Sequence, residues 1–168
     1  AGKDVTVNGE VKDDLRFAAY ALKLGPNAKI GDDVIAGCYS LETSQGSSVG
    51  GTLVLGGYQG LLNGQVNEKA NLGVNSLELN GVINGDVQLA VDGTENDDFS
   101  PAYMTPMGSD LPVVPSVKPG LNFGPEAKIN GKLDYTSPTL YNIPAGIVSG
   151  AVTHSEPPIS PEDVSQYH

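Results

Sequence analysis

The sequence predicts an all-β solenoid, a three-sided parallel β-helix of about seven coils with one long loop insertion. Three observations predict it. One apolar template recurs seven times, turn residues recur at the same phase of that template, and the apolar content is mostly Val, Leu, Ile and Ala. Aliphatic residues suit stacked strands, whereas the chain has no Trp and only 3 Phe from which to build an aromatic core.

Each copy of the template reads apolar-x-apolar, a turn, one apolar residue, and four residues later a second apolar-x-apolar pair, with occasional small or polar substitutes. Successive copies begin 17, 19, 19, 17, 44 and 20 residues apart. The copies are Val5, Val7, Val11, Leu15, Phe17; Leu22, Leu24, Ile30, Val34, Ala36; Leu41, Thr43, Val49, Leu53, Leu55; Gly60, Leu62, Val66, Ala70, Leu72; Leu77, Leu79, Ile83, Val87, Leu89; Leu121, Phe123, Ile129, Leu133, Tyr135; and Tyr141, Ile143, Val148, Val152, His154.

The alternation of apolar and polar residues indicates strands with one buried face, because runs this short cannot form amphipathic helices. A period of 17 to 19 residues divides into three sides of about six residues. Asn-Gly usually indicates a two-residue hairpin. Here an equivalent strand follows each turn at the same phase, which favours corners of a coil instead. Coils then stack about 4.8 Å apart and bury one another's inner faces.

The turn between the first two sides of a coil has two forms. Asn8-Gly9, Asn63-Gly64 and Asn80-Gly81 are short, and such pairs can turn a chain tightly because both residues tolerate positive φ. Gly25 to Lys29 and Gly124 to Lys128 are longer versions of the same corner.

Residues 94–119 fit no coil and contain 5 of the 12 prolines, so we place an insertion loop at 94–120 between coils five and six. It is interpreted as a draped excursion, or as a partner-contact loop in which Phe99, Tyr103, Met104 and Met107 cover the rod or meet another molecule. The β-helix domain is assigned to 1–154, and the Pro-rich acidic segment 155–168 to a tail or linker.

The formal net charge of −11 disfavours binding to nucleic acid, whose phosphates it would repel. A single cysteine, Cys38, permits no internal disulfide, and no apolar run is long enough to span a bilayer. The chain does not begin with Met, and we expect a fragment or processed form. A signal peptide, earlier coils or a membrane anchor would then lie outside it.

The residues predict no catalytic, cofactor or metal site. His154 occupies an otherwise apolar repeat position, the only other histidine is the terminal His168, and Cys38 has no nearby His to activate it. The sole arginine, Arg16, occupies an outward position. Asp13-Asp14 and Asp32-Asp33 stack at one corner, but without the glycine-rich repeat of calcium-binding coils, so they are interpreted as solvated acids.

Several repeats resemble the polymer-forming bactofilin family, among them Val5 to Leu15, Gly25 to Val34 and Leu79 to Val87. The closing run from Ala127 to Val152 is similar to a membrane-associated branch of that family. The resemblance covers residues 5–93 and 121–154. It implies a bacterial, right-handed β-helix that assembles end to end without nucleotide, and a membrane-associated scaffold of the cell envelope outside the cytoplasm. The insertion and the acidity depart from the short cytoskeletal members.

A solenoid end exposes unpaired backbone groups and a slice of core unless it is capped. We therefore expect a structural, non-enzymatic protein that is its own partner and forms a filament or scaffold. Membrane or cell-envelope components would join through segments outside the chain. Two alternatives stay open: the ends join coils missing from a fragment, or the rod is a binding module that docks through its sides and the 94–120 loop. The expected assembly contacts are Val5, Val7, Val11, Leu15, Phe17, Tyr141, Ile143, Val148 and Val152.

Overall fold

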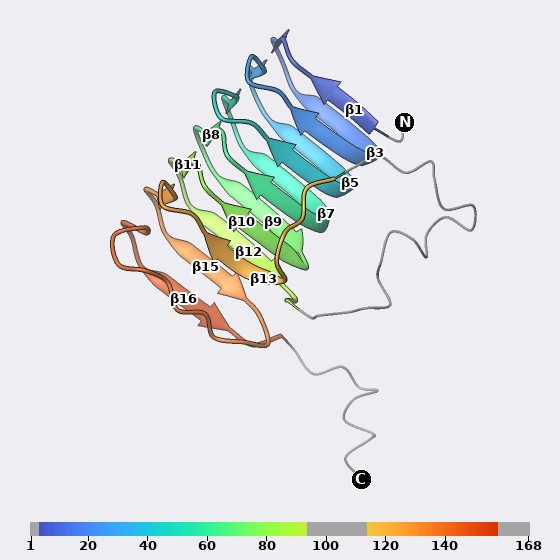
Figure 1. Cartoon of the computed structure of the whole chain (residues 1–168). Helices are drawn as coiled ribbons and strands as arrows, with labels where there is room; N and C mark the ends of the chain where they lie inside the picture. The colour runs from blue at the N-terminus through green and yellow to red at the C-terminus, as the bar shows by residue number, and fades with distance from the viewer. Residues whose placement is uncertain (1–3, 94–113, 158–168) are drawn as a thin grey trace, which may run out of the picture.

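The computed structural model describes residues 4–93 and 114–157, where every regular element is a β-strand (Figure 1). The strands are β1 (Asp4–Val7), β2 (Glu10–Val11), β3 (Leu15–Leu24), β4 (Lys29–Ile30), β5 (Val34–Thr43), β6 (Ser48–Val49), β7 (Leu53–Leu62), β8 (Gln65–Val66), β9 (Ala70–Val74), β10 (Ser76–Leu79), β11 (Val82–Ile83), β12 (Val87–Val91), β13 (Gly120–Phe123), β14 (Lys128–Ile129), β15 (Leu133–Thr136) and β16 (Val152–Ser155).

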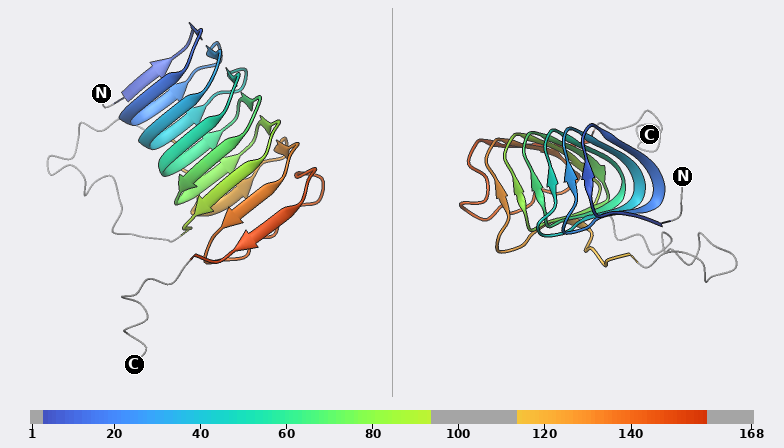
Figure 2. Two further views of the ribbon diagram at one scale, coloured as in Figure 1. Left: turned by 180° about the vertical axis from the view of Figure 1, so that it is seen from behind. Right: turned by 90° about the horizontal axis from the view of Figure 1, so that it is seen from above.

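All pairings are parallel, and each strand lies against its equivalent one coil away (Figures 1 and 2). One sheet holds ten strands in the order β1-β3-β5-β7-β9-β12-β15-β16, with β10 joined to β7 and β13. The other holds six short strands in the order β14-β11-β8-β6-β4-β2. The predicted parallel β-solenoid of about seven coils is therefore confirmed.

The predicted register is also confirmed. Val5 pairs with Leu22, Val11 with Ile30, and Leu15 with Val34, and these columns continue through the later coils. Across the insertion, β10 pairs with β13 and β12 with β15, so coils five and six stack directly. The inward columns form one continuous apolar core along the rod.

Each long strand supplies the last side of one coil and the first side of the next, and bends near Tyr20, Tyr39 or Tyr58. In the next coil the bend becomes a break at Asn75, between β9 and β10. The carbonyl of Asn75 accepts hydrogen bonds from the N–H groups of both Gly93 (2.9 Å) and Gly120 (3.1 Å). The insertion thus leaves and rejoins the rod at one corner, and the stacked coils on either side stay undisturbed.

The short turns contain the predicted Asn-Gly pairs, but none of the residues in these pairs uses the positive φ that it tolerates. Within the described residues, only Gly46, Gly93, Gly120 and Gly146 have it. Glycine is needed in the short turns of coils four and five because the coils approach closely there, whereas a Cβ on Gly9 would have nothing within 4 Å. A Cβ on Gly81 would lie 2.0 Å from the carbonyl oxygen of Gly64, and one on Gly64 would lie 2.2 Å from Oγ of Ser47.

The first side of coil seven also differs from the expected repeat. Val148 bridges to Ile129 and β16 pairs with β15, as the template requires, but residues 137–147 contain no strand. Pro138 and Pro144 lack the N–H that a ladder needs. The hydroxyl of Tyr135 instead accepts a hydrogen bond from the N–H of Tyr141 (3.0 Å).

Residues 114–119, here called the strap, run across the near side of the rod to β13 (Figure 1). The amide of Gln59 donates to the carbonyl oxygen of Pro115 (2.7 Å) and to Oγ of Ser40 (3.0 Å). Val117 is buried, as are Ser40 and Ser76 in the same outward column as Gln59. The end of the insertion therefore packs on the rod, whereas Phe99, Tyr103, Met104 and Met107 lie outside the described residues.

Candidate assembly interface

The first coil ends the rod with a half-exposed apolar layer. Val5, Val7, Val11, Leu15 and Phe17 point inward and pack against the core, yet each is only partly buried. The equivalent side chains one coil further on are buried; they include Leu22 (1% exposed), Ile30 (2%) and Val34 (0%). The difference arises because, within the described residues, no coil covers the outer side of β1, β2 and the first half of β3.

The backbone at this end carries a donor aimed out of the rod. In each later coil one N–H donates back to the preceding coil: Gly31 to Val11 (2.7 Å), Gly50 to Ile30 (2.7 Å), and so on to Ser149 and Ile129 (2.9 Å). Lys12 occupies this position in coil one. Its N–H therefore faces outward, where the described chain offers no preceding coil.

The C-terminal end has the opposite polarity at the same corner. The carbonyl oxygens of Val11, Ile30 and Ile129 each accept the bond from the following coil, and Val148 is the next in that column. Its carbonyl oxygen faces out of this end. The free edge of β16 lies alongside, and Val152 is 45% exposed.

The remaining expected contacts at this end are less regular. Tyr141, Ile143 and Val148 are half-buried and pack against the core. The ring of His154, in β16, packs at a tilt against the buried Tyr135 ring with centroids 4.8 Å apart, and its Nε2 lies 3.0 Å from the carbonyl oxygen of Ser137. The structure thus brings the expected residues into two groups, one at each end of the rod.

A ladder of stacked tyrosines lies at the bend of the long strands and was not predicted from the sequence. The ring of Tyr39 lies between those of Tyr20 and Tyr58, each centroid 4.9 Å away and nearly parallel. Burial, with smaller effects from the two neighbouring hydroxyls, raises the pKa of Tyr39 to about 12. The signal was present, because the three tyrosines are spaced by 19 residues at one phase of the repeat.

Cys38 lies beside this ladder in β5 and is buried. Burial raises the pKa of its thiol to about 11, so the thiolate is scarce at neutral pH. The thiol is therefore part of the buried core.

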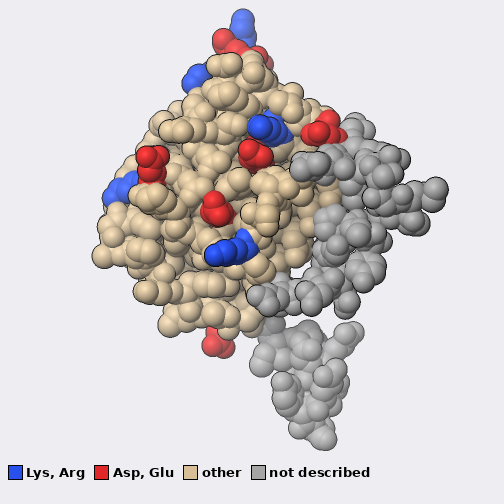
Figure 3. Space-filling view, in the orientation of Figure 1, with Lys and Arg blue, Asp and Glu red and all other residues tan. Residues whose placement is uncertain are grey.

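The acidic corner has a structural role. Oδ1 of Asp14 accepts a hydrogen bond from the N–H of Asp33 (3.1 Å), and Oδ1 of Asp33 accepts one from Thr52 (2.7 Å). Carboxylate oxygens of Asp14, Asp32 and Asp33 lie within 4.8 Å of one another. The negative charge of Asp33, followed by that of Asp14, raises the pKa of Asp32. The carboxylates at this corner therefore repel one another. On the near face, charged side chains are few and scattered rather than gathered in a patch (Figure 3).

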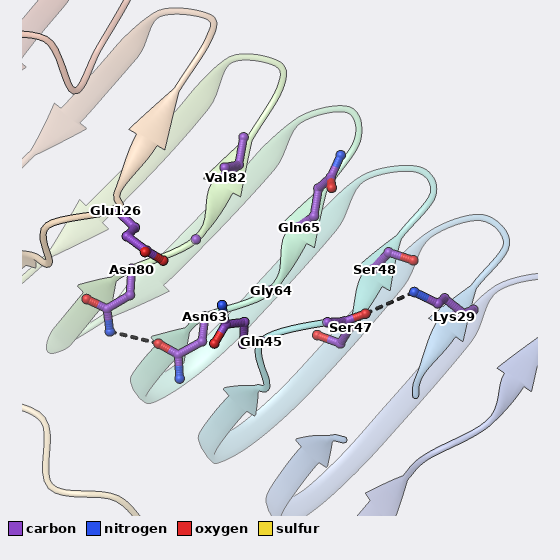
Figure 4. A pocket seen from close by; sticks show the side chains of 12 residues that line it. Lys29, Gln45, Ser47, Ser48, Asn63, Gly64, Gln65, Asn80, Val82 and Glu126 are labelled. Carbon is purple, nitrogen blue, oxygen red and sulfur yellow. Dashed lines mark hydrogen bonds between the residues drawn. The ribbon is translucent and has the colours of Figure 1, made fainter. Parts of the chain in front are cut away.

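A polar notch lies where the short turns follow one another (Figure 4). Its floor is formed by Asn63-Gly64 and Asn80-Gly81, and its volume is about 260 Å³. One wall is Gln45 to Ser48 with Lys29, and the other is Glu126. The amide of Asn80 donates to Oδ1 of Asn63 (2.7 Å), and Nζ of Lys29 donates to the carbonyl oxygen of Gly46 (2.9 Å).

No family model, curated protein or solved structure matches the chain. Within residues 4–93 and 114–157, no helix is long and apolar enough to cross a membrane.

Proposed function

We propose that this chain is a structural, non-enzymatic protein of the bactofilin type, which assembles end to end into a filament or scaffold. The observation that carries the proposal is the open first coil. Five inward apolar side chains remain half-exposed there, whereas the residues at the same positions of coils two to five are buried. Covering them with another coil would remove apolar surface from water, at about 25 cal/mol per Å².

Backbone polarity supports joining of unlike ends. The N–H of Lys12 points out of the first coil, and the carbonyl oxygen of Val148 points out of the last. A second rod placed beyond either end would extend the existing parallel ladder at this corner with the same donor and acceptor pattern. The irregular segment 137–147 limits the C-terminal contact to the Val148 corner and β16.

The chemistry of the described residues favours a structural role over catalysis. Ser137, next to His154, is fully buried and donates its hydroxyl to the carbonyl of Thr139. The Cys38 thiol is buried with its pKa raised to about 11. The bactofilin resemblance supports a bacterial, membrane-associated location in the cell envelope, with the chain itself as partner and no nucleic acid.

Sedimentation velocity across protein concentration tests the proposal. Val5→Asp with Phe17→Asp places two charges in the open layer, and we expect this variant not to grow into longer assemblies as the protein concentration rises. Thr6→Asp with Ala18→Asp is the matched control, because it adds the same charges to outward, exposed positions of the same strands. Growth of the wild type and the control, but not of the inward variant, supports the proposal. Equal sedimentation of all three at every concentration refutes it.

A second candidate is a binding module that docks through its side. The outer face of β5 and β7 favours it, because a Cβ on Gly37 or Gly56 would have nothing within 4 Å. Glycine within a strand lowers the stability of the sheet. No close contact within the described chain requires glycine at positions 37 and 56. A wild type that stays a single rod, yet loses binding to a cell-envelope partner when Gly37 and Gly56 are replaced by Arg, would favour this candidate.

A further inference from the structure

The turn between the first and second sides changes length in a regular order along the rod. Coil one has two residues, Asn8-Gly9; coils two and three have four; coils four and five have two; coils six and seven have four. Each four-residue turn is closed by a hydrogen bond from its last N–H to its first carbonyl, at residues 25–28, 44–47, 124–127 and 144–147. The long turns project and the short turns are recessed, which produces the notch over coils four and five (Figures 1 and 4).

The notch is lined by groups suited to a polar polypeptide turn. Within the described residues, no hydrogen bond involves the side chains of Gln45, Ser48 or Glu126, which line its walls. The projecting turns of coils two and three carry polar groups of the same kind, namely the Asn27 amide and the Gln45 amide with the backbone around Gly46. Amides and carbonyls are complementary to themselves, because each presents both donors and acceptors.

We propose that this notch receives the projecting turns of a second copy of the chain, laid side by side with the first and running in the opposite direction. With the two-fold axis between coils three and four, coil one faces coil six, coil two faces coil five, and coil three faces coil four. A short turn then meets a long turn at all six positions. Such a contact uses the same surface on both copies and closes as a dimer.

Charge on the adjoining short strands matches the same register. The outward column runs Glu10, Lys29, Ser48, Gln65, Val82, Lys128 from coil one to coil six. The two-fold arrangement places Glu10 opposite Lys128 twice, Ser48 opposite Gln65 twice and Lys29 opposite Val82 twice, so the only charged pair it forms is one of opposite sign. A parallel arrangement offset by two coils also matches the turn lengths, but it puts Glu10 opposite Ser48 and Lys128 opposite Gln65. The charge pairing therefore favours the antiparallel pair.

This pairing goes beyond end-to-end assembly, because it uses a side of the rod and no open end. The test is therefore made on chains that also carry Val5→Asp and Phe17→Asp, so that end contacts contribute nothing. Cys38→Ser removes the native thiol. Failure of end-to-end growth in the parent chain and failure of side pairing in this background are then separate results.

Disulfide trapping tests the register. Glu10→Cys with Lys128→Cys places thiols five coils apart in one chain, about 24 Å, which is too far for an internal bond. The antiparallel pair brings them together, and we expect a disulfide-linked dimer after mild oxidation. Glu10→Cys with Ser48→Cys is the matched control for the parallel offset, with thiols about 10 Å apart in one chain. A dimer from the control alone, or from neither variant, overturns the proposal.

Charge exchange tests the contact without cysteines. Glu10→Lys should weaken the dimer by about 3- to 10-fold in Kd, because two exposed ion pairs per dimer are lost and like charges are opposed. Glu10→Lys with Lys128→Glu should restore the affinity in sedimentation equilibrium. A double variant that is no tighter than the single one contradicts the pairing.

Discussion

The side-chain amide of Gln59 donates a hydrogen bond to the carbonyl oxygen of Pro115, across 56 residues of sequence and onto the side of the rod. The same amide also donates to Ser40, and both side chains are buried beneath the strap. The strap is thus part of the packed structure rather than of the loop that precedes it. We expect Gln59→Leu to destabilise the fold by about 1–3 kcal/mol, because it leaves the Ser40 hydroxyl and the Pro115 carbonyl short of a donor.

Urea unfolding followed by circular dichroism measures this cost, with Ser116→Ala, an exposed strap position, as the control.

The packing of the strap also determines which residues of the insertion can be removed without loss of stability. Replacing 94–113 by a Gly/Ser linker of about twelve residues, whose average span is about 17–21 Å, should leave the fold intact. Deleting 94–119 should instead expose the buried polar column. Equal stability of the two deletions would contradict the packing role of the strap.

Two adjacent glycines in β7 should respond oppositely to alanine. A Cβ on Gly57 would lie 1.8 Å from the carbonyl oxygen of Cys38, whereas a Cβ on Gly56 has nothing within 4 Å. Gly57→Ala must displace backbone, and we expect a loss of about 2 kcal/mol or more. Gly56→Ala should gain about 0.5–1 kcal/mol, because alanine loses less conformational entropy in a strand. Thermal unfolding of the two variants side by side checks the prediction, which similar melting temperatures would overturn.

The centre of the tyrosine ladder should matter more than its end. Tyr39 stacks on both Tyr20 and Tyr58, whereas Tyr20 stacks on Tyr39 alone. Tyr39→Leu therefore removes two ring contacts, and we expect it to cost about 1–3 kcal/mol, roughly twice the cost of Tyr20→Leu. Tyr39→Phe keeps the ring and is the control. If Tyr20→Leu costs as much as Tyr39→Leu in urea unfolding, stacking is not the source of the stability.

The acidic corner should destabilise the rod at neutral pH. Asp33 and Asp14 raise the pKa of Asp32 above its usual value of 3.8, so the folded state holds its proton more tightly than the unfolded state. The protonated carboxyl of Asp32 therefore contributes to the stability of the folded state below its usual pKa. That contribution is lost as the pH rises through the raised pKa. Asp32→Asn should therefore raise the melting temperature at pH 7. The gain should vanish below about pH 3 and shrink in high salt.

Asp134→Asn, which removes an exposed carboxylate outside the cluster, is the control for that experiment. A gain that persists unchanged at low pH would show that replacement of the side chain, rather than relief of repulsion, causes the stabilisation.

Most of the rod followed from periodicity. Columns such as Val11, Ile30 and Val49 were predicted because one buried residue recurs at one phase, and strand pairing obeys that phase. Coil seven shows where this reasoning stops. Tyr141 and Ile143 keep the apolar phase, but the flanking prolines and the Tyr135 hydroxyl prevent a ladder.

Two further features depend on contacts that a repeat pattern does not encode. The strap interacts with Gln59 through a backbone carbonyl, which any residue at position 115 would supply, so no sequence signal marks it. The short turns were predicted from the Asn-Gly pairs, but the close approach of the preceding coil to Gly81 was not. The partly buried layer at Val5 and Phe17 was predictable, because these residues lie in the first copy of the repeat that the described residues contain.

The most direct test of end-to-end growth is filament length in negative-stain electron microscopy, for the wild type alone and with a small fraction of the Val5→Asp, Phe17→Asp chain. That variant retains its C-terminal end, so it should add to an open first coil and then present a blocked one. We predict filaments whose mean length falls as the variant fraction rises. Single rods about 34 Å long at every wild-type concentration, or filaments whose length ignores the variant, would contradict it.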